Sequence, residues 1–263
     1  MKRPLLSWIV PGAFALLLVV GCNQDAGGKA EAKSPNEQSK EAPPKLSKLV
    51  IEDTKEGTGP AIEKGDSAYL LYAGRLVDGT EFDSNLTAKF PFAVTVGMGQ
   101  VIKGWDEGLI GLKKGGKRTL KIPSDMAYGP QGNQKIPPNS DLIFDVELVD
   151  LVKAGEEDIV DWEIQTPGTG PACKAGDQIT IDYVALSPLD SKFEEWTNQK
   201  FKLGTDGNIG LPGLDFGITG MKVGEKRRIR LPGKVAYGMG GRPDLNVPAN
   251  MVVYFEVTLK GIG

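Results

Sequence analysis

The chain carries one domain-sized pattern twice, and this internal repeat limits its fold more than any other feature of the sequence. The sequence GTGPA stands at positions 57–61 and again at positions 168–172. A GD pair stands at 65–66 and 176–177, and an AYG triplet at 127–129 and 236–238. A nearly constant spacing between similar segments indicates a duplicated folding unit. We therefore expect two homologous domains, over residues 48–153 and 154–263.

The hydrophobic pattern of the first copy predicts several strands and one helix. Apolar and polar residues alternate over residues 142–148, which is the period of a half-buried strand. Apolar residues over 101–112 recur with the spacing of one helix face, and the glycine pair 115–116 would end that helix. Shorter alternating runs predict further strands near residues 68–72, 92–96 and 120–122. The combination predicts an α+β domain, with the helix packed on one face of an antiparallel sheet.

The first residues have the composition of an export signal. Two basic side chains precede an apolar stretch over residues 5–20, which is shorter than the roughly 20 residues of a membrane span. The stretch ends in VVGC, which resembles the lipobox of bacterial lipoproteins, whose cysteine receives acyl chains such as palmitate. We expect a signal peptide over 1–21, a lipidated Cys22, and a disordered tether over 22–47. The protein would then be anchored to a membrane of the bacterial cell envelope and face the periplasm or exterior.

The composition excludes several kinds of chemistry. The 263 residues include no His, which removes Ser-His-Asp and Cys-His catalysis and His-containing metal sites. The net charge of −3 offers no electrostatic basis for binding nucleic acid. We expect neither a cofactor nor a metal. The basic runs KRTLK and KRRIR are interpreted as solvent-facing sides of strands, and Cys173 as a turn residue without a role unless its thiol is exposed.

Five motifs of the first copy carry an unusual set of aromatic and polar residues. In chain order they read DGTEFDS, VIKGWDEG, AYG, KIPP and LIFDVEL. A single buried aromatic residue is usually part of a core, but these motifs occur together, in one order and spacing. In this respect residues 48–152 resemble the FKBP-type, or macrolide-binding, peptidyl-prolyl cis-trans isomerases. The resemblance implies a twisted antiparallel sheet wrapped around a short helix, with an aromatic pocket between them.

The resemblance also implies a role for each residue of the pocket. Trp105 would form the floor, and the backbone N–H of Ile102, at the rim, would hold a substrate carbonyl. The Tyr128 hydroxyl would donate to the peptide, and Asp83 would form a polar wall. The other implied lining residues are aromatic walls, a rim residue and one loop residue, namely Tyr72, Phe82, Phe92, Phe144, Val101 and Ile136.

The implied reaction moves no protons, which suits a chain without His. X–Pro bonds exchange isomers over tens to hundreds of seconds. A twisted amide has lost its resonance and has a less polar carbonyl, so a dry aromatic pocket binds it better than the planar form. The expected partners are proline-containing polypeptides outside the cytoplasm, with macrolides as inhibitors. Two alternatives stay open: a non-enzymatic chaperone or proline-peptide-binding module using the same pocket, and an adhesion-type surface factor.

The second copy keeps the frame of the first but loses part of the pocket. Leu214 takes the place of Trp105, and a four-residue deletion aligns Phe92 with Gln199. We predict a degenerate site with little or no isomerase activity, formed by Tyr183, Phe193, Glu194, Leu211, Leu214, Tyr237 and Phe255. A substrate-holding or spacing role and pure scaffolding are the alternatives for this domain.

Overall fold

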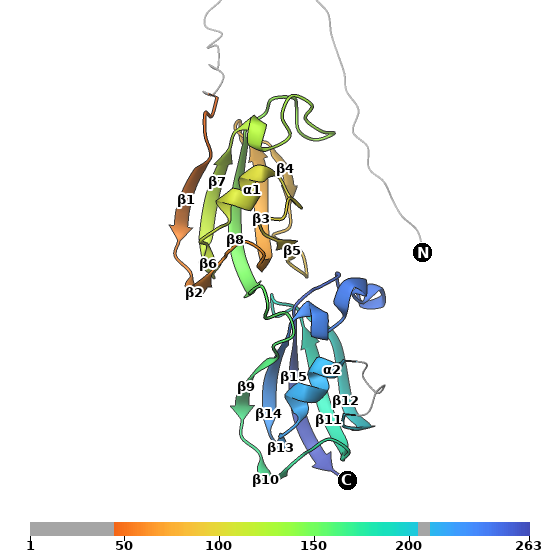
Figure 1. Ribbon diagram of the computed structural model, residues 1–263. Helices are drawn as coiled ribbons and strands as arrows, with labels where there is room; N and C mark the ends of the chain where they lie inside the picture. Colours follow the sequence, from red (N-terminus) through yellow and green to blue (C-terminus); the bar gives the residue numbers. More distant parts are fainter. Residues whose placement is uncertain (1–44, 205–210) are drawn as a thin grey trace, which may run out of the picture. The chain divides into compact units, whose positions relative to one another are not determined.

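The computed structural model describes residues 45–204 and 211–263, which fold as two similar sheet domains (Figure 1). The predicted signal peptide, Cys22 and nearly all of the tether lie outside these residues. Both sheet domains fall within one compact unit of the chain. No helix within the described ranges is long and apolar enough to cross a membrane.

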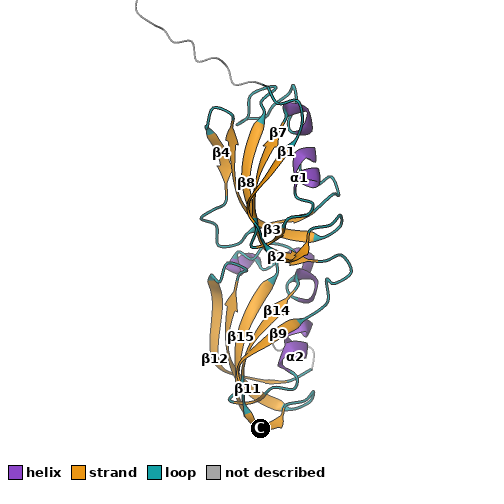
Figure 2. Cartoon of the chain, turned by 90° about the vertical axis from the view of Figure 1, so that its left-hand side faces the viewer, coloured by secondary structure: helices purple, strands orange, loops and turns teal. Residues whose placement is uncertain are grey.

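The first domain is an antiparallel sheet with one short helix against it (Figure 2). The strand order is β1-β7-β8-β3-β4, and β5 also pairs with β3. These strands are β1 Val50–Lys55, β3 Ser67–Leu76, β4 Glu81–Ser84, β5 Phe92–Thr95, β7 Lys117–Ile122 and β8 Leu142–Val152. A separate ladder joins β2 (Thr58–Ala61) to β6 (Lys113–Lys114), and the helical segments are α1 Lys103–Gly108 and the 3-10 turn η1 Ser124–Met126.

The core of this domain lies between α1 and the sheet. Strand β8 buries every second side chain through most of its length, as its alternating sequence predicts. Those side chains share one cluster with Trp105 on the helix. Gly104 lets the helix approach closely, because a Cβ at this position would lie 2.3 Å from the Ile122 side chain. The helix therefore covers one face of the sheet, as predicted, and a glycine on its contact side permits the close approach.

Helix α1 is shorter than the predicted helix over residues 101–112. It ends at Gly108, and the chain then turns through Gly111, whose φ is +84°. Leu109 and Leu112 are nevertheless buried, so their helical spacing reflects core packing beyond the helix end. The glycine pair 115–116 lies between β6 and β7 and does not end the helix, which corrects that prediction.

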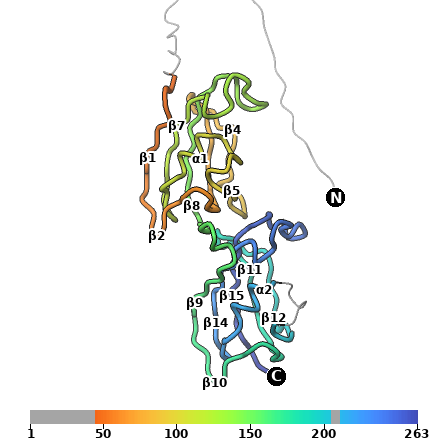
Figure 3. Tube along the Cα trace, viewed as in Figure 1, coloured from red at the N-terminus to blue at the C-terminus, as the bar shows by residue number. Residues whose placement is uncertain are grey.

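The second domain repeats this architecture (Figure 3). Its main sheet has the antiparallel order β12-β11-β15-β14-β9, and β10 pairs with β13. The strands are β9 Asp161–Thr166, β10 Thr169–Ala172, β11 Gln178–Leu186, β12 Lys192–Lys202, β13 Lys222–Val223, β14 Lys226–Leu231 and β15 Val253–Ile262. The helical segments are α2 Pro212–Ile218 and the 3-10 turns η2 Gly233–Val235, η3 Gly238–Gly240 and η4 Pro243–Leu245. The predicted α+β class, with two sheet-and-helix domains, is confirmed.

The deletion predicted in the second copy changes one edge of its sheet. In the first domain, β4 and β5 are separate strands, and Phe92 pairs with Leu70 of β3. In the second domain a single long strand, β12, replaces both, and Gln199 pairs with Ile181. Ile181 and Leu70 occupy equivalent positions of the repeat, as do Tyr183 and Tyr72. The strand register thus confirms the alignment of Phe92 with Gln199.

The basic runs KRTLK and KRRIR do not simply face solvent. Arg118 and Arg227 are buried, and each donates to backbone carbonyls at the end of the domain's helix. Arg118 donates to the carbonyls of Gly108 and Ile110, at 2.7 and 2.8 Å. The last carbonyls of a helix have no partner within the helix, so a buried guanidinium that satisfies them explains the burial. The interpretation as solvent-facing strand sides was wrong for these two arginines.

Cys173 follows β10 and is buried, with 2% of its surface exposed. Its Sγ lies 3.2 Å from the Ile218 carbonyl oxygen. Burial raises the pKa of its thiol. The thiol therefore packs in the core of the second domain, and an exposed, pairing thiol at this position is excluded for the folded state.

Candidate active site

An aromatic cluster lies where α1 meets the sheet of the first domain. Trp105 is at its centre and only 4% exposed. The rings of Tyr72, Phe144 and Phe92 surround it edge-on, with centroids 5.2, 5.1 and 6.0 Å from that of Trp105. Phe82 packs edge-on against Phe144 at 5.5 Å. The structure therefore brings together all five aromatic residues predicted as floor and walls, in a geometry that aromatic rings favour.

The cluster is closed at its base and reaches solvent at its edge. Trp105 and Phe144 are buried, whereas Phe92 is 40% exposed and Tyr128 is also exposed. An apolar surface that is partly exposed beside buried rings can accept an apolar group from outside and strip it of water. A prolyl ring fits this requirement, because it is compact and carries no N–H.

Gly74 of β3 makes room for two of these rings. A Cβ at this position would lie 2.6 Å from an atom of Phe144 and 2.7 Å from one of Phe82. Both distances are shorter than any normal carbon contact. The edge-to-face pair of Phe82 and Phe144 therefore depends on the absence of a side chain at residue 74. The repeat places Ala185 at the equivalent position of the second domain.

Asp83 lies at the polar edge of the cluster. The Tyr72 hydroxyl donates to its carboxylate over 2.7 Å, and the Lys135 ammonium lies 3.8 Å away. Burial raises the pKa of Tyr72, and the hydrogen bond to Asp83 raises it further. Tyr72 thus stays protonated and directs its proton at Asp83, which fixes the orientation of the carboxylate beside the rings.

The rim of the cluster includes the residue that begins the helix. Ile102 is the N-cap of α1, and it packs together with Val101 against the core. Among the described residues, the Ile102 N–H has no hydrogen-bond partner. The indole N–H of Trp105 is buried and likewise lacks a partner in the described part of the chain. The Ile102 N–H, at the half-buried rim, is therefore a candidate substrate contact, whereas the buried indole N–H carries the desolvation cost of an unpaired donor.

The loop after the AYG triplet carries two more predicted residues. Ile136 is fully buried in the core of the first domain, whereas Tyr128 is exposed. Asn133 holds the loop in shape, because its side-chain oxygen accepts from the backbone N–H groups of Lys135 and Ile136 at 2.8 and 2.9 Å. The loop is therefore ordered by its own hydrogen bonds, and it brings Lys135 close to Asp83.

The equivalent cluster of the second domain has a different composition. Tyr183 and Phe255 pack at 5.6 Å, and Leu214 occupies the helix position of Trp105. Leu211 is the N-cap of α2, as Ile102 is of α1. Phe193 makes a ring contact with Tyr237 at 6.4 Å. The predicted residues are again neighbours, but the central indole is missing.

Polar side chains adjoin this second cluster. Arg242 lies 3.6 Å from the Glu194 carboxylate, and its guanidinium is 5.7 Å from the centre of the Tyr237 ring. Trp196 donates its indole N–H to Glu194 at 3.2 Å. Burial, together with the nearby Glu194 charge, raises the pKa of Tyr237 to about 12. The carboxylate of Glu194, which is equivalent to Asp83, therefore contacts Arg242 and Trp196 of its own domain.

Comparison with known proteins agrees with the geometry of both domains. The model of the FKBP-type peptidyl-prolyl cis-trans isomerase family matches residues 59–149 and again residues 170–260. The chain belongs to this family. An FK506-binding protein of Neisseria meningitidis serogroup B is 53% identical over 102 residues, which is 38% of this chain and 94% of that protein. Human FKBP9 is 33% identical over 201 residues, which is 75% of this chain and 35% of that isomerase. Human FKBP4 is 34% identical over 226 residues, covering 82% of this chain and 49% of that isomerase.

The protein is thus an FKBP-type peptidyl-prolyl isomerase with two tandem family domains. Two residues of the first site were not predicted from the sequence: Gly74 and Lys135. The sequence holds a signal for Gly74, because the repeat pairs it with Ala185 in an otherwise similar strand. Lys135 carries no comparable signal, since its contact depends on how the loop folds back toward Asp83.

Proposed function

We propose that the first domain performs the isomerisation of X–Pro bonds and that the second does not. The observation that carries this assignment is the complete aromatic cluster around Trp105, beside Leu214 and Ala185 at the equivalent positions of the second domain. A ring floor and ring walls desolvate a prolyl amide, whereas a leucine side chain offers a smaller apolar surface.

In this proposal the site acts by binding the twisted amide more tightly than the planar one. The prolyl ring would lie against Trp105, where water is excluded and the amide loses the solvation that favours its polar, planar form. The Ile102 N–H would hold the carbonyl of the peptide, and the Tyr128 hydroxyl would donate to its backbone. Because rotation breaks no covalent bond, neither a nucleophile nor a general base is required.

Matched variants in the two domains of the full chain test the assignment. We expect Trp105→Ala and Asp83→Ala to lower kcat/KM for an Ala-Leu-Pro-Phe peptide by about tenfold or more, which is about 1.4 kcal/mol in the barrier. Leu214→Met, which keeps the volume of this fully buried side chain, and Glu194→Gln are the controls at equivalent positions and should change kcat/KM less than about twofold. Since Asp83 is exposed, its variant should fold even where Trp105→Ala does not. Equal losses from the two pairs would refute the assignment.

The same pocket would bind FK506-type macrolides and proline-containing polypeptides. The support is the family membership, the name of the Neisseria relative and the exposed edge of the cluster. A macrolide that competes with the peptide substrate in the wild type but not in Trp105→Ala is the expected result. A chain that binds proline peptides without accelerating their isomerisation would instead be a chaperone or binding module, which is the alternative function.

We further propose that the protein is a lipid-anchored folding helper of the bacterial cell envelope. The support lies in the sequence, where an apolar stretch ends in VVGC and an extended polar segment follows. Acyl chains on Cys22 would anchor the chain, since each buried CH₂ contributes about 0.8 kcal/mol. We expect Cys22→Ser to move the protein from the membrane fraction to the soluble fraction, while Cys173→Ser leaves the partition unchanged. Membrane partition that survives Cys22→Ser would refute the anchor.

A further inference from the structure

Successive residues of strand β5 in the first domain contact two different hydrophobic clusters. Phe92 packs against Tyr72 and Trp105 of the aromatic cluster, with centroids 6.0 Å apart in both cases. Ala93, the next residue, packs against the hydrophobic core that includes the second domain. Because side chains alternate between the two faces of a strand, one backbone segment serves the active site on one side and the domain contact on the other.

Phe90 anchors this segment in the second domain. Its ring is buried, and its centroid lies 5.5 Å from that of Phe193 at the start of β12. The Lys89 ammonium lies 6.0 Å from the centre of the same Phe193 ring. The preceding residues 86–89 are exposed, so Phe90 is the first residue after β4 and its turn that is held by packing. Phe92, two residues later, is the first residue of β5, so its position is set by its pairing with Leu70 on one side and by where Phe90 is fixed on the other.

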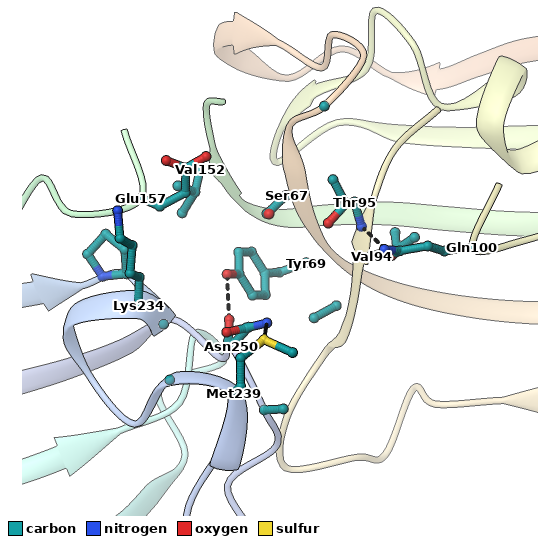
Figure 4. A pocket seen from close by; sticks show the side chains of 16 residues that line it. Ser67, Tyr69, Val94, Thr95, Gln100, Val152, Glu157, Lys234, Met239 and Asn250 are labelled. Atoms are coloured by element: carbon teal, nitrogen blue, oxygen red, sulfur yellow. Dashed lines mark hydrogen bonds between the residues drawn. The ribbon is translucent and has the colours of Figure 1, made fainter. Parts of the chain in front are cut away.

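The strand that pairs with β5 is held from the second domain as well. Tyr69 of β3 stands opposite Ala93 in the ladder, and its hydroxyl donates to the Asn250 carbonyl at 2.9 Å. Figure 4 shows this hydrogen bond among the side chains that line a cavity, including Tyr69, Val94 and Asn250. The cavity has a volume of about 590 Å³. The contact is therefore distributed over both strands of the β3–β5 pair.

A buried charge cluster adds to the same contact. Asp150 of β8 is 2% exposed and accepts from Arg230 of the second domain at 3.1 and 3.2 Å. The Tyr254 hydroxyl also donates to Asp150, and Arg230 donates to the Leu151 carbonyl at 2.8 Å. A buried carboxylate that accepts from several donors keeps these hydrogen bonds only in a narrow range of geometries. The Asp150 cluster therefore restrains Arg230 and Tyr254 of the second domain against β8 of the first.

We propose that the second domain positions the Phe92 wall of the first domain's active site, and that Phe193 is the positioning residue through its contact with Phe90. The second domain thereby contributes to catalysis without binding substrate. Loss of the Phe193 ring frees the segment over residues 90–92, and Phe92 then spends less time against Trp105. This inference rests on the proposed assignment of catalysis to the first domain.

A double-mutant cycle in the full chain tests the proposal. Phe193→Ala should lower kcat/KM for the peptide substrate by about three- to tenfold, because small misplacements of a binding group are costly in rate. Phe90→Ala should have a similar effect, and the double variant should lose no more than either single variant, since both remove one contact. Phe216→Ala is the matched control, because this exposed ring of the second domain contacts Trp162 instead.

Further readouts separate positioning from general loss of structure. Phe193→Leu, which keeps an apolar side chain over Phe90, should restore most of the activity. If Phe193→Ala unfolds the second domain, Phe90→Ala supplies the same test from the first domain. Wild-type kcat/KM in both alanine variants, or losses that multiply in the double variant, would overturn the proposal. Failure of the proposed function would appear differently, as equal losses from the Trp105 and Leu214 variants.

Discussion

Replacing Gly74 by Ala tests whether the active-site cluster depends on space left by a missing side chain. The new Cβ would lie 2.6 Å from Phe144 and 2.7 Å from Phe82, whereas ordinary contact begins at 3.4 Å. Both rings, or the backbone that carries residue 74, must therefore move by about 0.7 to 0.8 Å. The displaced atoms belong to ring side chains packed in the cluster, so neither ring can give way without disturbing its neighbours.

The expected cost follows from this displacement. Overpacking in a well-packed core costs about 1–3 kcal/mol, and weakening an edge-to-face aromatic pair adds about 0.5–1.5 kcal/mol. For a domain of this size each kcal/mol lowers Tm by about 4–8 °C. We therefore expect Gly74→Ala to lower the Tm of the first domain by at least about 5 °C. A shift approaching 1 Å at a binding wall should also lower kcat/KM by about tenfold or more.

The assay combines calorimetry with peptide isomerisation on the full chain. Ala185→Gly, at the equivalent position of the second domain, is the matched control. It should destabilise the second domain by about 0.5–1 kcal/mol, the usual cost of glycine within a strand, and leave kcat/KM unchanged. A Gly74→Ala protein with wild-type Tm and wild-type kcat/KM would show that the two rings do not need this space, and the argument from close contact would fail.

Three further predictions concern individual side chains. Tyr72→Phe keeps the ring but removes the hydrogen bond to Asp83, and should lower the urea unfolding free energy by about 0.5–1.5 kcal/mol. Burial alone would raise the pKa of Asp150, but Arg230 and its other partners lower it overall, so its contribution to stability is complete above about pH 5, begins to fall near the unfolded pKa of about 4, and is lost as the pH falls further through the lowered pKa of the folded state. Urea unfolding between about pH 3 and 7 should accordingly depend less on pH in Asp150→Asn, and identical slopes would contradict this. Cys173 should react with iodoacetamide only in unfolded protein, because its thiol is buried and its pKa raised, and rapid labelling of native protein would disprove it.

Much of the fold could be predicted because its signals are local or repeated. Alternation over β8 and the recurrence of landmarks at a nearly constant spacing need no knowledge of tertiary contacts. The helix end could not be predicted in the same way. Leu109 and Leu112 keep helical spacing although they follow the helix, because the core requires apolar side chains there whatever the local backbone does.

The candidate site likewise has one part that the sequence predicted and one part that it did not. Its aromatic residues were predicted as a set, since their types and order resemble those of the family, and the structure places them around Trp105. The roles of Ile102 and Tyr128 toward a substrate stay predictions. The hydrogen bonds of Asn133, which shape the loop, depend on a loop conformation that no pattern in the sequence specifies.

The order and spacing of residues were enough to establish a duplicated α+β chain, a family, and a first copy that keeps aromatic residues at the two pocket positions where the second has Leu214 and Gln199. These are properties of strand period and motif spacing, which the chain carries along its length. Only the tertiary structure decided that Arg118 is buried against a helix end, that Gly74 leaves room for two rings, and that Phe90 packs on Phe193. Each of these depends on which side chains the folded sheets bring face to face, and no local pattern records a contact between residues as far apart in the sequence as Phe90 and Phe193.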